Sequence, residues 1–249
     1  MNFNFKNKNV LITGTSQGIG YQLAKDFIDD GARVIGVSRK KTIIKGDYYH
    51  IVEDLFKLNS VKNIITKLKN KKLWPIDILV HNAGGTLDIT DPFCSQKDWK
   101  KVFRINFEVI VELDSFISKS MIKRKKGRIV YVSSISAMEN HGPVTYCSAK
   151  AALAAYTRSF GGILAPHGIV ASCVLPGAVI APNNYWDKKI KSDPKHVKKY
   201  LTERQRIGRF GNTKEISNFI KFLSSEYASF NTGSIIPIDG GQGRGYFGQ

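Results

Sequence analysis

The sequence has little that would mark a secreted, metal-binding or membrane-spanning protein. It holds only three cysteines, Cys94, Cys147 and Cys173, and this odd, widely spaced set fits neither a disulfide framework nor a zinc site. No apolar stretch approaches the roughly 20 residues that cross a bilayer. Residues 1–9 lack the apolar core of a signal peptide. We therefore expect a cytoplasmic protein with no metal site and no membrane contact.

Acidic side chains are also scarce. The chain has 38 Lys and Arg but only 20 Asp and Glu, which gives a formal net charge of +18. Such an excess is typical of proteins that meet nucleic acid, an anionic membrane surface or an anionic substrate. A lysine-rich proteome is the simpler explanation, because Lys is spread along the whole chain. No nucleic-acid-binding motif accompanies the charge, so we expect no nucleic-acid partner.

Apolar, β-branched runs alternate with helical patterns along the chain, and 42% of the residues are hydrophobic. Strands are expected over residues 9–13, 33–38, 49–53, 76–81, 128–132, 170–175 and 234–238. Helices are expected over residues 19–30, 61–70, 99–120, 144–164 and 213–224. Continuous apolar strands separated by helices predict a parallel sheet covered on both faces. The expected fold is α/β: a single doubly wound, Rossmann-type domain over residues 1–249, with a seven-stranded parallel sheet that binds ligands at the carboxyl ends of its strands.

The first expected strand ends in a glycine-rich turn, Thr13-Gly14-Thr15-Ser16-Gln17-Gly18-Ile19-Gly20. Gly14 permits the tight turn, Gly18 lets the backbone approach a pyrophosphate, and Gly20 allows close contact between helix and strand. The N–H groups and the dipole of the following helix favour an anion there. The turn therefore predicts a dinucleotide site with contacts from Gly14, Ser16, Gln17, Gly18, Ile19 and Gly20.

Short polar motifs follow most of the other strands. They are Asp54-Leu55, Asn82-Ala83-Gly84, Ser133-Ser134, Pro176-Gly177 and Asp239-Gly240-Gly241, with Asn106 in the central helix and Tyr146-x-x-x-Lys150 after the fifth strand. With the Gly-x-x-x-Gly-x-Gly spacing of the glycine turn, these motifs resemble the short-chain dehydrogenase/reductase family, in its short, single-domain form, over nearly the whole chain. Within that family the chain is similar to the 3-oxoacyl-acyl-carrier-protein reductases, and residues 184–188 and 241–244 are similar to members in surface-sugar biosynthesis.

The resemblance implies a nicotinamide cofactor and assigns further contacts to it. In family members the turn at Asp54 and Leu55 holds the adenine ring. Ala181 stands where the family often places the Thr that contacts the carboxamide, which leaves the backbone of Val179 for that contact. Beyond the glycine turn, the implied cofactor contacts are Asp54, Leu55, Asn82, Ala83, Gly84, Tyr146, Lys150, Pro176, Gly177 and Val179.

The end of the second expected strand, Val37-Ser38-Arg39-Lys40, distinguishes NADP(H) from NAD(H). An acidic residue at this position would bond a free ribose 2′-hydroxyl and repel a 2′-phosphate. Ser38 stands there instead, and Arg39 can form charge-assisted bonds to a phosphate. Ser16 can add a hydroxyl. We therefore expect NADP(H) to be preferred over NAD(H); the alternative is that Arg39 stacks on adenine and tolerates either cofactor.

Tyr146 and Lys150 predict the chemistry. An ordinary Tyr has a pKa of about 10 and needs help to exchange a proton at neutral pH. The two residues are four apart on an expected helix, so they share one face, and the ammonium should lower the pKa of the phenol. Hydride would pass between nicotinamide and a carbonyl or secondary alcohol, with Tyr146 as general acid/base. The resemblance adds Asn106, which would anchor a water that links Lys150 to solvent.

A serine should orient the substrate oxygen. Ser134 precedes Tyr146 by twelve residues and Ser133 by thirteen, which is the spacing of many family members. We prefer Ser134, because the segment that follows it is similar to the one after the catalytic serine of the family; Ser133 stays open. Further substrate contacts are expected from His141, in the loop before Tyr146, and from Trp186.

Trp186 lies within residues 181–200, the segment that covers the substrate in this family. The segment carries Lys188, Lys189, Lys191, Lys195, Lys198 and Lys199. So many cations predict an anionic substrate, such as a sugar derivative or an acyl carrier. A solvated helix whose charges face water is an equal alternative.

The family resemblance implies a homotetramer, or a dimer, built from the long central helices and the terminal strand. Gly161 and Gly162 lie inside an expected helix, where each costs about 1 kcal/mol, so we expect close packing against a neighbouring subunit there. The alternative to an enzyme is a non-catalytic, dinucleotide-binding regulator of the same fold. The presence of Asn106, Ser134, Tyr146 and Lys150 together argues against it.

Overall fold

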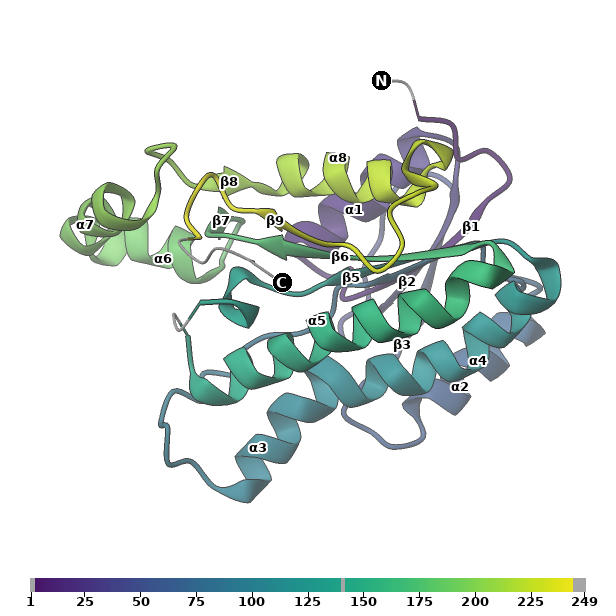
Figure 1. Ribbon diagram of the computed structural model, residues 1–249, viewed down its shortest axis with the longest axis horizontal. Helices are drawn as coiled ribbons and strands as arrows, with labels where there is room; N and C mark the ends of the chain where they lie inside the picture. Colours follow the sequence, from purple (N-terminus) through teal and green to yellow (C-terminus); the bar gives the residue numbers. More distant parts are fainter. Residues whose placement is uncertain (1–2, 140–141, 244–249) are drawn as a thin grey trace.

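Seven parallel strands form the centre of the computed structural model, which describes residues 3–139 and 142–243 (Figure 1). They are β1 (Asn9–Thr13), β2 (Arg33–Ser38), β3 (Tyr48–Val52), β4 (Ile78–His81), β5 (Gly127–Val132), β6 (Ile169–Pro176) and β9 (Ile235–Ile238). Their order across the sheet is β3-β2-β1-β4-β5-β6-β9, and every neighbouring pair is parallel. The predicted doubly wound, seven-stranded sheet is confirmed.

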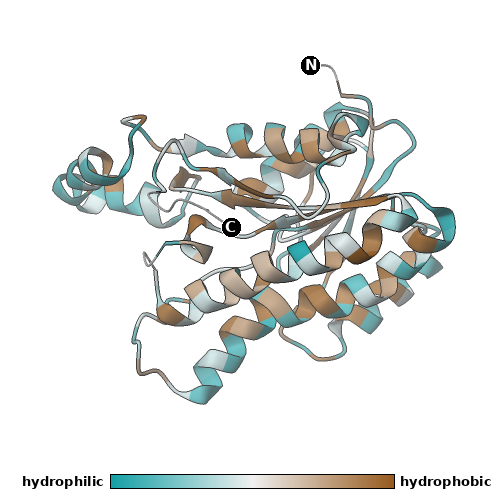
Figure 2. Cartoon of the chain, in the orientation of Figure 1, coloured by the Kyte–Doolittle hydropathy of each residue, from teal (hydrophilic) through white to brown (hydrophobic). Residues whose placement is uncertain are grey.

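Helices cover both faces of this sheet (Figure 1). On one face lie α1 (Gly18–Asp29) and α8 (Thr213–Ser224), and on the other α2 (Ser60–Asn70), α4 (Val109–Arg124) and α5 (Val144–Leu164). Each face has its own apolar core, one around Phe27 of α1 and the other around Leu113 of α4 and Leu153 of α5. Figure 2 shows the strands as mostly hydrophobic, as expected for a sheet buried on both faces.

The strand order places a crevice between β1 and β4. From β1 the chain moves outward to β2 and β3, and from β4 it moves outward in the opposite direction. Ligands of such sheets bind where the order reverses, beyond the carboxyl ends of the strands. The two turns at this point are joined directly, because the Asn82 side chain donates to the carbonyls of Thr13 (3.0 Å) and Gly14 (3.1 Å).

The single helix expected over residues 99–120 is wrong in its extent and its continuity. The chain instead forms α3 (Gln96–Phe103), a π-helical turn (Arg104–Glu108) and then α4. The start moves forward because the Ser95 hydroxyl accepts from the Asp98 N–H (3.2 Å) and caps the helix. The π turn contains Asn106, the residue singled out from the sequence.

Two helices project from the carboxyl end of the sheet: α6 (Tyr185–Ser192) and α7 (Pro194–Arg204). Both are largely hydrophilic in Figure 2. Below them β7 (Val179–Ile180) pairs with β8 (Gly211–Asn212), two strands too short to give a sequence period. Short 3₁₀ turns cover Ile135–Ala137, Ala165–His167 and Glu226–Ala228.

The expected packing of Gly161 against a neighbouring subunit is wrong. A Cβ at Gly161 would lie 2.7 Å from the Gly233 nitrogen and 3.3 Å from the Thr232 hydroxyl, so the glycine accommodates the loop before β9 of its own chain. At Gly162 an added Cβ would meet nothing within 4 Å. Across the two described ranges, no helix combines the length and apolar character that a bilayer crossing requires.

Candidate active site

A groove of about 810 Å³ opens at the predicted position, beyond the carboxyl ends of β1, β2, β3 and β4. Twelve residues predicted to bind the cofactor line it: Gly14, Ser16, Gln17, Gly18, Ile19, Ser38, Arg39, Asp54, Leu55, Asn82, Ala83 and Gly84. Sequence reasoning missed six other lining residues: Val37, Lys40, Glu53, Phe56, Leu87 and Ile105. Phe56 could have been found from its place beside Asp54-Leu55 in the sequence. In the structure the Arg39 guanidinium lies over its ring, 5.8 Å from the centroid.

The glycine turn fits a pyrophosphate. Gly14 and Gly18 have positive φ angles of +78° and +62°, and a Cβ at Gly20 would lie 2.3 Å from the Gly14 carbonyl oxygen. At Gly18 the space is open, with Ala181 Cβ as the nearest atom at 4.0 Å. No side chain caps the start of α1 and its first turn holds no acidic residue, so its N–H groups and dipole favour an anion.

Asn106 connects the π turn to the loop after β4. Its side-chain oxygen accepts from the Gly85 N–H (3.0 Å), and its amide donates to the carbonyls of Gly85 (2.9 Å) and Val102 (2.9 Å). Asn106 is fully buried. Its side chain therefore holds the loop that carries Gly84 at the groove wall.

Gly84 lies between the groove and Lys150. A Cβ at Gly84 would lie 2.5 Å from Asn106 Oδ1 and 3.1 Å from Lys150 Nζ, so the glycine leaves room for both. Lys150 is 2% exposed, and its ammonium donates to the Val132 carbonyl (2.9 Å) at the end of β5. The structure thus brings Asn106, Lys150 and the cofactor groove together.

Tyr146 lies one helical turn before Lys150 on α5, with the Lys150 Nζ 5.6 Å from its ring centroid. Its hydroxyl shares a hydrogen bond with Ser134, which follows β5. Ser134 is buried; its hydroxyl also accepts from the Ser136 N–H (3.1 Å) and donates to the Ser136 hydroxyl (3.1 Å). Tyr146, Ser134 and Lys150 therefore form one cluster at the carboxyl end of the sheet.

Ser133 faces away from this cluster. Its hydroxyl donates to the Lys150 carbonyl (3.0 Å), which fastens α5 to the end of β5. A hydroxyl bound to a buried carbonyl is not presented to a ligand. The geometry thus favours Ser134 over Ser133 as the serine that meets a substrate oxygen.

The expected lowering of the Tyr146 pKa by Lys150 is absent in the free chain. Burial raises the pKa of Tyr146 to about 12, against a smaller lowering from its hydrogen bond with Ser134. Burial also lowers the pKa of Lys150 to about 8, opposed by the nearby Cys173. Both groups resist charge because burial, the largest cause of each shift, disfavours the charged form. The Tyr146 phenol is therefore neutral at pH 7, and Lys150 holds its proton less tightly than an ordinary lysine does.

The other six predicted cofactor contacts, Gly20, Tyr146, Lys150, Pro176, Gly177 and Val179, do not line the groove. Pro176 ends β6 and Gly177 follows it, and a Cβ at Gly177 would lie 2.9 Å from the Gln242 side-chain oxygen. The Val179 carbonyl accepts from the Asn184 side chain (2.8 Å). The backbone of Val179 is therefore engaged within the base of α6 in the free chain.

Trp186 is the centre of an aromatic cluster. Its ring lies 4.2 Å from that of Tyr200, 4.7 Å from that of Phe210 and 6.2 Å from that of His196. These contacts join α6 to α7. The other predicted substrate contact, His141, lies outside the described residues.

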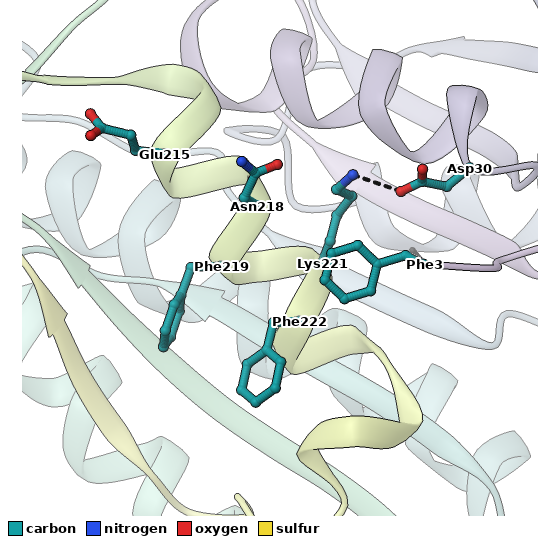
Figure 3. Close-up of a pocket in the computed structure, with 7 residues that line it drawn as sticks. All are labelled: Phe3, Asp30, Glu215, Asn218, Phe219, Lys221 and Phe222. Carbon is teal, nitrogen blue, oxygen red and sulfur yellow. Dashed lines mark hydrogen bonds and ion pairs between the residues drawn. The ribbon is translucent and has the colours of Figure 1, made fainter. Parts of the chain in front are cut away.

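A second pocket, of about 590 Å³, lies where Phe3 meets α1 and α8 (Figure 3). The Lys221 ammonium points across it to the Asp30 carboxylate (2.6 Å), so its charge is neutralised. Phe219 and Phe222 of α8 present partly buried rings there. None of the predicted site residues lines this pocket. The chemistry therefore lies at the groove.

Comparison with known proteins agrees with this arrangement. Residues 8–189 match the family described as short chain dehydrogenase. The 3-oxoacyl-[acyl-carrier-protein] reductase of Buchnera aphidicola subsp. Schizaphis graminum is 34% identical over 242 residues, which cover 94% of this chain and 96% of that protein.

Two solved structures have the same fold over nearly their full lengths. L-sorbose reductase from Gluconobacter frateurii, complexed with NADPH and L-sorbose, has a TM-score of 0.90 and 25% identity, covering 99% of this chain and 100% of its own. A 4-hydroxyisoleucine dehydrogenase complexed with NADH has a TM-score of 0.88 and 26% identity, covering 96% and 100%.

Proposed function

This chain belongs to the short-chain dehydrogenase/reductase family and is an oxidoreductase, and from that premise we propose that it reduces a carbonyl group to an alcohol with NADPH, with Tyr146 as the proton donor. One observation carries the proposal. Tyr146, Ser134 and Lys150 lie together beside Gly84, at the end of a groove with the glycine turn of a dinucleotide site.

The side chains divide the work as follows. When bound, the reduced nicotinamide supplies the hydride that reaches the carbonyl carbon. Ser134 donates a hydrogen bond to the substrate oxygen and orients it, and Tyr146 gives that oxygen its proton. Lys150 places a positive charge near the phenol as it loses the proton. Asn106 holds the Gly85 loop and with it the shape of the site.

The raised pKa of Tyr146 favours the reductive direction. A phenol with a pKa of about 12 carries its proton at neutral pH and can deliver it as negative charge develops on the substrate oxygen. Oxidation of an alcohol needs the phenolate instead, which burial disfavours. The name of the curated relative, a 3-oxoacyl-[acyl-carrier-protein] reductase, supports the same direction.

The preference for NADPH over NADH rests on the end of β2. Ser38 and Arg39 line the groove where a carboxylate would repel a 2′-phosphate, and Lys40 adds a second cation. One similar structure is complexed with NADPH and another with NADH, so the fold by itself allows both.

For the substrate we propose an anionic ketone, such as a 3-oxoacyl group on a carrier or a sugar derivative, covered by residues 181–200. The supporting observation is the surplus of lysines on α6 and α7. Lys191 and Lys199 pair with acidic residues of their own helices, and Lys189 pairs with Asp193 between α6 and α7. Lys188, Lys195 and Lys198 are exposed, and the described residues give them no ion pair. These three remain available to an anion.

The direct test measures NADPH loss at 340 nm across a panel of ketones, 3-oxoacyl thioesters included. We expect Tyr146→Phe to lower kcat about a thousandfold, the usual size of a general-acid contribution. Its Kd for NADPH should match that of the wild type, because the ring stays in place. If both proteins oxidise NADPH equally with every responsive ketone, Tyr146 is not the proton donor.

The proposal includes a homotetramer in the cytoplasm. Phe116 on α4 and Ile163 on α5 are 49% and 64% exposed, and both lie on the long helices from which the subunit contacts are expected. β9 is at the edge of the sheet, where an unpaired strand can meet a second subunit. Light scattering gives the mass in solution, and a monomer at micromolar concentration would contradict this part.

A further inference from the structure

Strand β3 carries two polar side chains that face the cofactor turns. Tyr48 and His50 are two residues apart, so they project from the same face, and their rings stack with centroids 6.1 Å apart. The Tyr48 hydroxyl bonds that of Thr15 in the glycine turn (2.9 Å). Gly36 of β2 makes this possible, because a Cβ there would lie within 2.4 Å of the Thr15 hydroxyl.

His50 bonds both ends of the turn that follows β2. Its Nε2 lies 2.8 Å from the Ser38 hydroxyl, and its Nδ1 accepts from the Thr42 N–H at 3.4 Å. The Ser38 hydroxyl donates in turn to the Lys40 carbonyl (3.0 Å). The residues between these anchors include Arg39 and Lys40, the two cations that line the groove.

The protons in this chain of bonds have only one arrangement. A backbone N–H can only donate, so Nδ1 is the acceptor and the neutral ring carries its proton on Nε2. Nε2 therefore donates to Ser38. Because the Ser38 proton is already given to Lys40, Ser38 has no proton left for a phosphate. At the end of β2, recognition of a 2′-phosphate then rests on the two cations, and their position depends on the turn.

The surroundings keep the ring neutral. Burial lowers the pKa of His50, and the positive charge of Lys41 lowers it further. Ser38 is 8% exposed, so its bonds to His50 and Lys40 are shielded from competing water.

We propose that His50 is a positioning residue for cofactor choice: it sets the turn of residues 38–42 so that Arg39 and Lys40 meet the 2′-phosphate of NADPH. This inference rests on the proposed cofactor preference and deepens it. No contact between His50 and the cofactor is required.

Equilibrium titration with NADPH and with NADH, followed by cofactor fluorescence, tests the inference without any turnover. His50→Leu removes both bonds, and we expect the Kd for NADPH to rise about tenfold while that for NADH changes less than twofold. His50→Gln retains a donor for Ser38 and should recover part of the loss. The matched control is Tyr49→Leu, on the opposite face of β3 and 40% exposed, which should change neither Kd.

A double mutant shows whether His50 acts through Ser38. Ser38→Ala added to His50→Leu should cost little beyond the single substitution, because both remove the same chain of bonds. Equal weakening of NADPH and NADH, or no weakening of either, would overturn the inference. A wild type with no preference for NADPH would instead contradict the proposed cofactor, whereas a preference that His50→Leu leaves intact overturns only the role of His50.

Discussion

Tyr146 and Lys150 respond to the same burial in opposite senses. Removing water penalises whichever form is charged, so it raises the pKa of the phenol and lowers that of the ammonium. The consequence is a neutral donor beside a cation whose pKa of about 8 lies close to physiological pH. As the pH rises, Lys150 therefore loses its proton before Tyr146 does.

The pH dependence of reduction should report the deprotonation of Lys150. Lys150 is charged below its pKa and loses its proton as the pH rises through about 8, so kcat/KM for NADPH should fall above that pH. In Lys150→Arg the side chain stays charged, and the fall near pH 8 should disappear even if the rate is lower. A pH–rate profile of both proteins from pH 6 to 10 makes the comparison. The same alkaline fall in Lys150→Arg would assign it to another group.

The two adjacent serines should separate by readout. Ser134→Ala removes the hydroxyl that bonds Tyr146, and we expect kcat to fall about a hundredfold with stability nearly unchanged. Ser133→Ala removes the hydroxyl that donates to the Lys150 carbonyl and should cost about 1 kcal/mol of unfolding free energy, with a smaller effect on kcat. Urea denaturation and steady-state rates measure both. The reverse pattern would make Ser133 the serine that meets the substrate.

Among the helices and strands, sequence patterns predicted the elements with an extended apolar pattern and missed the short, irregular ones. The bounds of β1, β2, α5 and α8 agree with the expected ranges to the residue, because apolar runs define the strands, a long helical pattern defines α5, and a capping box begins α8. The π turn around Asn106 was missed, since a single segment of five residues is too short to show a period of its own. β7 and β8 contain two residues each, too few for any period.

In the candidate site, too, residues in local sequence motifs were predicted and contacts between distant residues were not. The glycine turn, the end of the second strand and the family motifs identified twelve groove residues, and the Tyr-x-x-x-Lys spacing identified Tyr146 and Lys150, because each of these signals lies within one turn or one helix. Contacts between distant residues gave no signal. His50 meets Ser38 across a strand pair, and His81 bonds Asp114, 33 residues away, inside the core. In the free chain the pKa of Tyr146 is raised, opposite to the expected lowering, because spacing reports the neighbouring charge but not the depth of burial.

The neighbouring glycines of α5 offer a matched pair. Gly161→Ala places a methyl group 2.7 Å from the Gly233 nitrogen, a backbone atom that has to move, so we expect a loss of about 2 kcal/mol. Gly162→Ala fills open space in a helix interior and should stabilise by about 1 kcal/mol. Thermal and urea denaturation compare the two. If Gly162→Ala destabilises as well, a second subunit packs against that position, as the sequence led us to expect.

At the scale of the whole molecule, the open question is whether the charge of +18 serves the reaction. Positive charges around a groove raise the rate at which anions enter it, by about ten- to a thousandfold at low ionic strength. The same number of cations spread over a distant surface has little effect, because salt screens charges beyond about 10 Å. Position, and not total charge, should therefore decide.

Two triple variants with the same net charge separate these cases. Replacing the exposed lysines of α6 and α7, Lys188, Lys195 and Lys198, with Gln should lower kcat/KM for an anionic ketone about tenfold at low salt, with kcat unchanged. The control replaces Lys6, Lys71 and Lys123, which are exposed and lie at or near the amino ends of the strands, and should leave kcat/KM as it was. The difference between the variants should shrink towards 0.5 M salt and be absent for a neutral ketone. Because both variants lose three charges, an equal response would assign the effect to overall charge, and no response in either would mean that the lysines of α6 and α7 only face water.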